Sequence, residues 1–184
     1  MDIWPVIHDE RKALATDLKG RSGEGWATDS LCSQWTVRDV LAHMTSTASL
    51  TPPAFFGKLV GSGFSFDKVQ EAGVAANRGS SPADTMARFE AELTSTKHPP
   101  GPADTWLGEA IVHAEDIRRP LGIEHHYPTE AVAQSSPVRP FRSAARALRS
   151  SWITGQTSMA VLPSGRGDGN PPPLPARLVW SRPN

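Results

Sequence analysis

The chain has 184 residues, the length of a single domain, and its 38% hydrophobic and 21% charged residues are typical of a globular protein rather than a disordered one. Nineteen basic and nineteen acidic residues give a formal net charge of zero, which excludes a general attraction to nucleic acid or to a membrane surface, and no apolar run approaches the ~20 residues of a membrane helix. The single cysteine, Cys32, excludes an internal disulfide and favours a cytoplasmic location.

Two helices are expected in the first 50 residues. Pro5 suits the first turn of a helix that Gly20 ends, and Thr36 with Asp39 three residues later forms a variant of the capping box at the start of "WTVRDVLAHM". The apolar residues expected to share a face are Ile7, Leu14 and Leu18 in the first helix and Val37, Val40, Leu41 and Met44 in the second.

Two further helices are expected beyond residue 80. Ser81 and Pro82 open a helix in "SSPADTMARFEAELTSTK", and "DTWLGEAIVHAEDIRRP" predicts another that Pro120 ends. The apolar stripe of the third helix is Met86, Phe89 and Leu93. Residues 51–80 mix proline, glycine and aromatics, so a long connection with short helical pieces is expected there. Four helices without a strand predict an all-α, four-helix bundle over residues 1–131.

The composition changes near residue 132. Residues 132–184 hold a single acidic residue, Asp168, beside seven arginines and a run of prolines. This segment is predicted to be a divergent, weakly structured and irregular tail, and its composition is that expected from a change of reading frame in a GC-rich gene. Without a closing helix, apolar faces of the bundle would be left uncovered, which would favour a homodimer.

The fourth helix contains a pair of residues that suits a metal ion. Glu109 and His113 lie one turn apart on the same face, so a carboxylate oxygen and an imidazole nitrogen can reach one cation. A third ligand must come from another helix, and His43, at the edge of the apolar stripe of the second helix, is the plausible donor. Two histidines and one carboxylate leave a position open for substrate, and they suit zinc, iron, nickel or manganese. The same spacing is also common on solvated helices that bind no metal.

Other polar residues near these helices have simpler alternatives. Asp116 is expected to accept a hydrogen bond from the ring of His113, and Asp39 could do the same for His43. Cys32 is expected to be a small buried residue and not a nucleophile. Arg118 and Arg119 could attract a carboxylate substrate, but two cations in the last helical turn more simply compensate the helix dipole.

Two segments, "SLCSQWTVRDVLAHM" (30–44) and "DTWLGEAIVHAEDIRRPLG" (104–122), carry a resemblance to a known family. They are similar to the signature segments of the mycothiol-dependent maleylpyruvate isomerase family, part of the DinB-like metal-binding superfamily of four-helix bundles. The resemblance covers about residues 1–130 and stops after "HHYPTEAV". It implies a DinB-like bundle with a divalent metal, usually Zn²⁺, on His43, Glu109 and His113, and mycothiol as thiol co-substrate.

The resemblance also implies an activity. A metal ion with an open position stabilises a thiolate, which could add to the double bond of a small electrophilic substrate and then leave, or remain attached. The predicted function is therefore a mycothiol-dependent isomerase or S-transferase with small-molecule partners and no nucleic acid or membrane partner. The alternatives are a helical bundle that binds metal without catalysis and a chain impaired by its divergent C-terminus.

Overall fold

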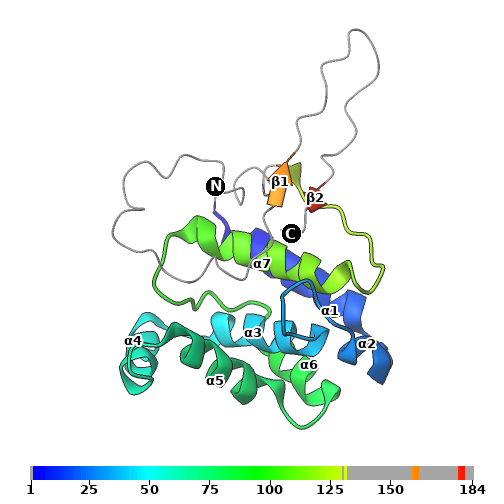
Figure 1. Cartoon of the computed structure of the whole chain (residues 1–184). Coiled ribbons are helices and arrows are strands. Elements are labelled where there is room, and N and C mark those ends of the chain that lie inside the picture. Colours follow the sequence, from blue (N-terminus) through cyan, green and yellow to red (C-terminus); the bar gives the residue numbers. More distant parts are fainter. Residues whose placement is uncertain (1, 130, 132–158, 162–177, 181–184) are drawn as a thin grey trace.

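The computed structural model describes residues 2–129, 131, 159–161 and 178–180, and within them the protein is almost entirely helical (Figure 1). This confirms the all-α prediction. The helices are α1 (Trp4–Leu18), α2 (Gly23–Ala27), α3 (Val37–Ser49), α4 (Pro52–Gly61), α5 (Phe66–Arg78), α6 (Pro82–Glu90) and α7 (Ala103–Arg118). None of these helices is long and apolar enough to cross a bilayer.

Only two short strands accompany the helices in the described part of the chain. Strands β1 (Met159–Val161) and β2 (Leu178–Trp180) pair antiparallel, with Met159 opposite Trp180. The rest of the tail predicted to be irregular lies outside the described residues. The division at residue 131, the change of reading frame and the homodimer therefore stay predictions.

The start signals of three helices are confirmed. Thr36 accepts a hydrogen bond from the backbone N–H of Asp39, whose carboxylate in turn accepts one from the Thr36 backbone, so the predicted capping box is complete at α3. At α6, the Ser81 hydroxyl accepts from the Asp84 backbone, and Pro82 occupies the first turn. At α1, proline again occupies the first turn. These local contacts fix where each helix begins and therefore which residues face inward.

Residues 51–80 differ from the prediction of a connection with short helical pieces. Two helices occupy this segment, and α5, at thirteen residues, is as long as α3. Ser65 caps α5 by accepting a hydrogen bond from the backbone of Lys68, and a break around Gly63, whose φ is +67°, separates α5 from α4. Of the glycines that suggested a loop, Gly63 marks the turn between the two helices, whereas Gly57 and Gly73 lie inside them.

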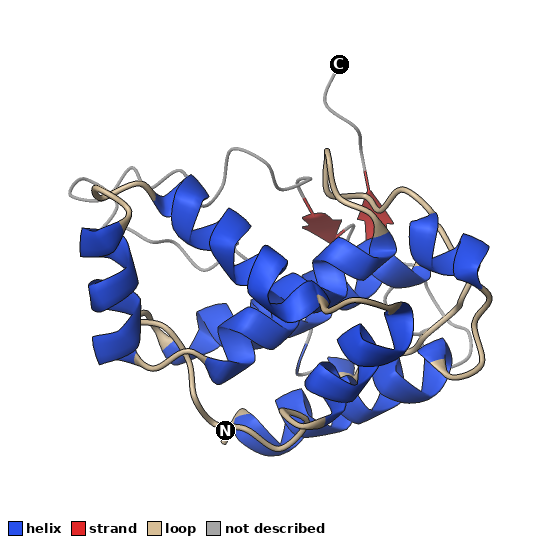
Figure 2. Ribbon diagram, turned by 90° about the horizontal axis from the view of Figure 1, so that it is seen from below, coloured by secondary structure: helices blue, strands red, loops and turns tan. Residues whose placement is uncertain are grey.

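Helix α3 is the central element of the fold. It packs against α5 on one side and against α7 and α6 on others, and α7 in turn packs along α1 (Figures 1 and 2). The largest core cluster joins α1, α3, α6 and α7 and buries most of the apolar faces predicted for α1 and α3, whereas Ile7 lies in a second cluster with Trp106 and Ile111. Members of the largest cluster include Leu14, Leu18, Val37, Val40, Leu41, Met44, Phe89, Ala114 and Ile117. α7 therefore lies with one face on α1 and another on α3, which places its middle turns in the interior.

The close approach of α5 to α3 depends on a glycine. A Cβ atom added at Gly73 would collide with the Ser46 hydroxyl oxygen and lie 3.2 Å from the Ser46 Cβ. Gly73→Ala is therefore expected to destabilise the protein by roughly 1–3 kcal/mol, although the same change normally stabilises a helix. Chemical denaturation measures the loss, and adding Ser46→Ala should recover part of it.

The matched control is Gly57→Ala in α4, where nothing lies within 4 Å of the added carbon. This variant is expected to gain roughly 0.5–1 kcal/mol from helix propensity alone. Equal effects at positions 57 and 73 would contradict the close packing of α5 on α3.

Candidate metal centre

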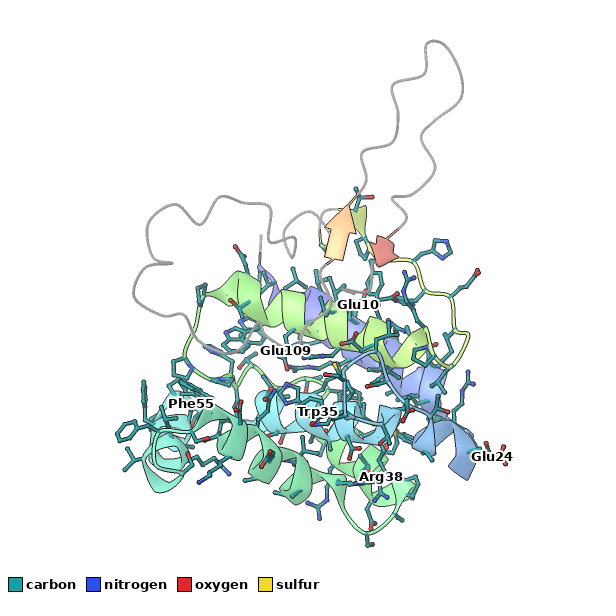
Figure 3. The ribbon with its side chains drawn as sticks, viewed as in Figure 1. Glu10, Glu24, Trp35, Arg38, Phe55 and Glu109 are labelled. Atoms are coloured by element: carbon teal, nitrogen blue, oxygen red, sulfur yellow. The ribbon has the colours of Figure 1, made fainter. Side chains whose placement is uncertain are left out.

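The structure brings the three predicted ligands together. His43 comes from α3, His113 comes from α7, and Glu109 extends from α7 toward α3 (Figure 3). One ligand atom of each residue lies within 4.8 Å of the others. His43 Nε2 is 3.7 Å from Glu109 Oε1, and the two imidazole rings meet edge to face at 5.0 Å between centroids. All three side chains are largely shielded from solvent, with the Glu109 side chain 14% exposed.

The local sequence explains this convergence. The capping box at Thr36 fixes the start of α3, so that His43 falls two turns later, at the margin of the face that packs on α7. The four-residue spacing of Glu109 and His113 places both on one face of α7. Contact between α3 and α7 therefore closes the cluster without any irregular backbone.

One oxygen of Glu109 has no partner in the described part of the chain. Glu109 Oε1 is buried and accepts no hydrogen bond there. Burial raises the pKa of Glu109, and the charge of His113 and a hydrogen bond from Thr47 offset this only in part. An unpaired buried carboxylate oxygen is costly for a protein, whereas a cation between it and the two rings would satisfy it. The donor set therefore fits a divalent metal, since atoms 3.7 Å apart can both lie at about 2.0–2.2 Å from one zinc ion.

The two imidazole rings differ in how readily they are protonated. Burial, helped by the charge of His113, lowers the pKa of His43 to about 3, so this ring is neutral at physiological pH and can donate its lone pair. Burial alone would lower the pKa of His113, but the hydrogen bond to Asp116 and the charge of Glu109 raise it above the ordinary value. The ring of His113 therefore holds a proton more tightly than that of His43, and because a metal ion competes with that proton, metal binding should strengthen as the pH rises.

Of the two carboxylates expected to support the histidines, only one does so. Asp116 Oδ2 lies 3.0 Å from His113 Nδ1, as predicted. Asp39 does not contact His43, and that prediction is wrong. Its carboxylate accepts hydrogen bonds from Thr36 and pairs with Arg78 at 3.1 Å, because the capping box draws it back toward the start of α3.

Arg118 lies in the last turn of α7, as predicted for a cation that compensates the helix dipole, but its surroundings differ from those of an exposed helix end. The Arg118 side chain is fully buried, and its Nε donates to Asp17 of α1 at 2.7 Å. It also donates to the Tyr127 hydroxyl at 2.8 Å. Arg119 is partly exposed and pairs with Glu115 one turn earlier. Neither arginine is among the residues that line the pocket at His43, so no contact supports their use for a carboxylate substrate.

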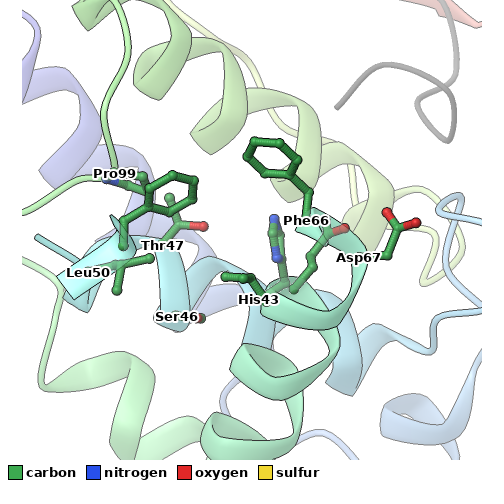
Figure 4. A pocket seen from close by; sticks show the side chains of 10 residues that line it. His43, Ser46, Thr47, Leu50, Phe66, Asp67 and Pro99 are labelled. Carbon is green, nitrogen blue, oxygen red and sulfur yellow. The ribbon is translucent and has the colours of Figure 1, made fainter. Parts of the chain in front are cut away.

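A small pocket opens onto the metal centre. The His43 ring points into it between Thr47 and Phe66 (Figure 4), and the cavity volume is about 40 Å³, enough for one or two waters. Much of its wall comes from α4 and α5. The lining residues are His43, Ser46, Thr47, Leu50, Phe55, Phe66, Asp67, Val69, Gln70 and Pro99.

Cys32 lies closer to this centre than its sequence position indicates. Its Sγ is 3.0 Å from Asp116 Oδ2 and 3.7 Å from His113 Nδ1, and the side chain is only partly buried. No sequence signal indicates this contact, because the loop and α7 are more than eighty residues apart. The same three side chains form a second group that could hold a metal ion.

The thiol of Cys32 is expected to react slowly. Burial, together with the charge of Asp116 and the hydrogen bond to it, raises the pKa of Cys32 well above its ordinary value, so little thiolate forms at pH 8. Alkylation by iodoacetamide at pH 8 should be at least roughly tenfold slower in the folded chain than in urea. Equal alkylation rates in the folded chain and in urea would contradict a thiol that is partly buried and held protonated.

Comparison with known proteins supports one family. The model of the mycothiol maleylpyruvate isomerase N-terminal domain matches residues 7–98, half of the chain. No curated protein and no solved structure matches. The matched region contains His43 and ends before Glu109 and His113, which lie on the helix that packs against it. The chain therefore belongs to the mycothiol maleylpyruvate isomerase N-terminal domain family.

Proposed function

We propose that the protein is a cytoplasmic, divalent-metal-dependent enzyme that uses a low-molecular-weight thiol, mycothiol, for isomerisation or S-transfer on a small electrophile. The observation that carries the proposal is the buried oxygen of Glu109 that accepts no hydrogen bond and lies beside two imidazoles, one of which, His43, lines a pocket. The family supports a thiol and a metal as partners. The single cysteine and the need for a reduced thiol support the cytoplasmic location.

Each residue has a distinct role in this proposal. His43, Glu109 and His113 would hold the cation, most simply Zn²⁺, and Asp116 keeps the His113 ring oriented through its Nδ1 atom. When bound, a zinc ion with an open position lowers the pKa of a thiol that reaches it. Cys32 is not the nucleophile in this proposal, because burial and Asp116 raise the pKa of its thiol.

The walls of the pocket indicate which part of an electrophile would lie beside His43. Phe55, Phe66, Leu50 and Val69 make these walls apolar, which favours carbon atoms over polar groups there, and the cavity of about 40 Å³ admits a small group rather than a whole substrate. When an attacking thiolate forms a C–S bond at an activated double bond, the π bond breaks and its electron pair moves onto the activating carbonyl. If the substrate then rotates about the former double bond, the electron pair returns and the thiolate leaves, the result is cis–trans isomerisation. If the adduct instead takes up a proton from water, the C–S bond persists and the result is S-transfer.

The test combines metal content, thiol binding and turnover. The full chain is loaded with Co²⁺, titrated with mycothiol and followed by absorption, since a thiolate ligand to cobalt gives a near-ultraviolet charge-transfer band. Turnover of maleylpyruvate and of 1-chloro-2,4-dinitrobenzene with and without mycothiol is then measured. We expect the band to appear and at least one reaction to require both zinc and thiol. Tight metal binding without a thiol band or any thiol-dependent reaction would instead favour a bundle that binds metal without catalysis.

A further inference from the structure

The loop between α2 and α3 is built to hold Cys32 against α7. Ser30 is its organising residue: its hydroxyl contacts the carbonyl oxygens of Cys32 and Trp35 and accepts from the Cys32 backbone N–H. The backbone N–H of Leu31 donates to the carbonyl of Asp116 at 3.2 Å, which joins the loop directly to α7. Hydrogen bonds within the loop and the hydrogen bond from the loop to α7 therefore both fix the position of the Cys32 thiol.

A single oxygen atom links the thiol to the metal centre. Asp116 Oδ2 lies 3.0 Å from the Cys32 Sγ and 3.0 Å from the His113 Nδ1. A carboxylate has only acceptor positions, so the thiol S–H and the ring N–H both donate to it. Asp116 is buried, and its aspartate carboxylate therefore depends on these two donors for its orientation.

We propose that Cys32 is a positioning residue of the metal centre: its S–H holds Asp116 Oδ2 where it accepts the Nδ1–H of His113. The ring is thereby fixed with Nε2 toward His43 and Glu109. The proposal rests on the metal site proposed above, but it concerns a residue outside the ligand triad. It gives the only cysteine of the chain a function that requires neither a nucleophile nor a disulfide.

Serine and alanine at position 32 provide a matched pair. Cys32→Ser keeps a hydroxyl donor of similar size, whereas Cys32→Ala removes the donor at nearly the same volume. Zinc affinity is measured by chelator competition on the full chain. Residues that orient a metal ligand typically contribute 10–100-fold to affinity, so Cys32→Ala should bind zinc about tenfold more weakly and Cys32→Ser should stay near the wild-type value. Ser33→Ala, at an exposed position in the same loop, is the control and should bind as wild type.

A second measurement does not depend on metal. In the zinc-free protein, exchange of the His113 Nδ1–H proton with solvent is followed by NMR, and we expect it to be faster in Cys32→Ala than in Cys32→Ser. In an Asp116→Asn background, Cys32→Ala should have little further effect, because the acceptor that links the two residues is changed.

Several outcomes would overturn the proposal. Unchanged proton exchange and zinc affinity in Cys32→Ala would mean that the thiol positions nothing. Equal losses in the serine and alanine variants would indicate packing alone. If both Cys32→Ser and Cys32→Ala lost zinc binding, and the cobalt-loaded wild type showed a thiolate band without added thiol, Cys32 would be a metal ligand. If the wild-type chain binds no zinc at all, the proposed function fails, and the proton-exchange comparison still decides the role of Cys32.

Discussion

Glu109→Gln is expected to abolish stabilisation by zinc while leaving the metal-free protein as stable as before or more so. Zinc at 100 times its dissociation constant should stabilise the wild type by about 2.7 kcal/mol, and this gain requires the carboxylate ligand. Without metal, Glu109 Oε1 is buried and accepts no hydrogen bond among the described residues, and burial outweighs the nearby charges of His113 and Arg11, so a neutral amide should remove a cost of roughly 1 kcal/mol. Thermal denaturation with and without zinc measures both effects.

The pH dependence of this variant has a definite sign. Burial raises the pKa of Glu109 in the folded chain, so the wild-type carboxyl favours folding below its unfolded pKa and loses that contribution as the pH rises through the folded value. The advantage of Glu109→Gln in metal-free protein should therefore be absent near pH 4 and grow toward neutral pH.

The same change at an exposed site is the control. Glu24 lies at the surface in α2, and Glu24→Gln should leave both the metal-free stability and the zinc effect unchanged. A Glu109→Gln variant that keeps the full zinc effect would show that Glu109 is not a ligand. A variant that unfolds readily without metal would show that the carboxylate has a structural partner instead.

Arg118→Met should destabilise the protein by about 3–5 kcal/mol. The Arg118 side chain is fully buried, and it joins α7 to Asp17 and Glu10 of α1 at 2.7 and 3.7 Å. Removing the guanidinium leaves both carboxylates without their main positive partner, although His125 still contacts Glu10 at 2.9 Å. Denaturation by urea measures the loss through the midpoint of the transition.

Lys12→Met in α1, the helix that carries Glu10 and Asp17, is the control for losing a positive charge. Lys12 pairs with Asp9 at 3.2 Å, but both side chains are mostly exposed, and such a pair contributes at most about 0.5 kcal/mol. A loss below about 1 kcal/mol for Arg118→Met would contradict a role for the buried ion pair in fixing α7 on α1.

Predictions from sequence succeeded where the physical cause was local. The capping box at Thr36 and the pairing of His113 with Asp116 each depend on residues three apart in one helix, so the pattern alone indicates them. His43 was predicted as the third ligand because it lies at the edge of the apolar face of another helix. The resemblance to a known protein family supported the same residue, and the structure places it 3.7 Å from Glu109.

Predictions failed where the partner lies far along the chain. Arg118 resembles a cation at a helix end, and only the docking of α1 brings Asp17 to it and buries it. Cys32 meets Asp116 through a loop whose path no pattern predicts. The α5 helix was missed because Gly73 weakens the helical pattern, and the reason for that glycine is a neighbouring helix at Ser46.

The placement of the ligands on two helices far apart in the chain has a kinetic consequence. Bringing α3 and α7 together requires closing a long loop, which lowers the entropy of the chain. This loop must close during folding before a cation can bridge His43 and Glu109. A bridging ion then resists separation of the two helices. Occupancy of the centre should accordingly lengthen the lifetime of the native chain, measured as slower unfolding or slower digestion by a protease, far more than it speeds refolding.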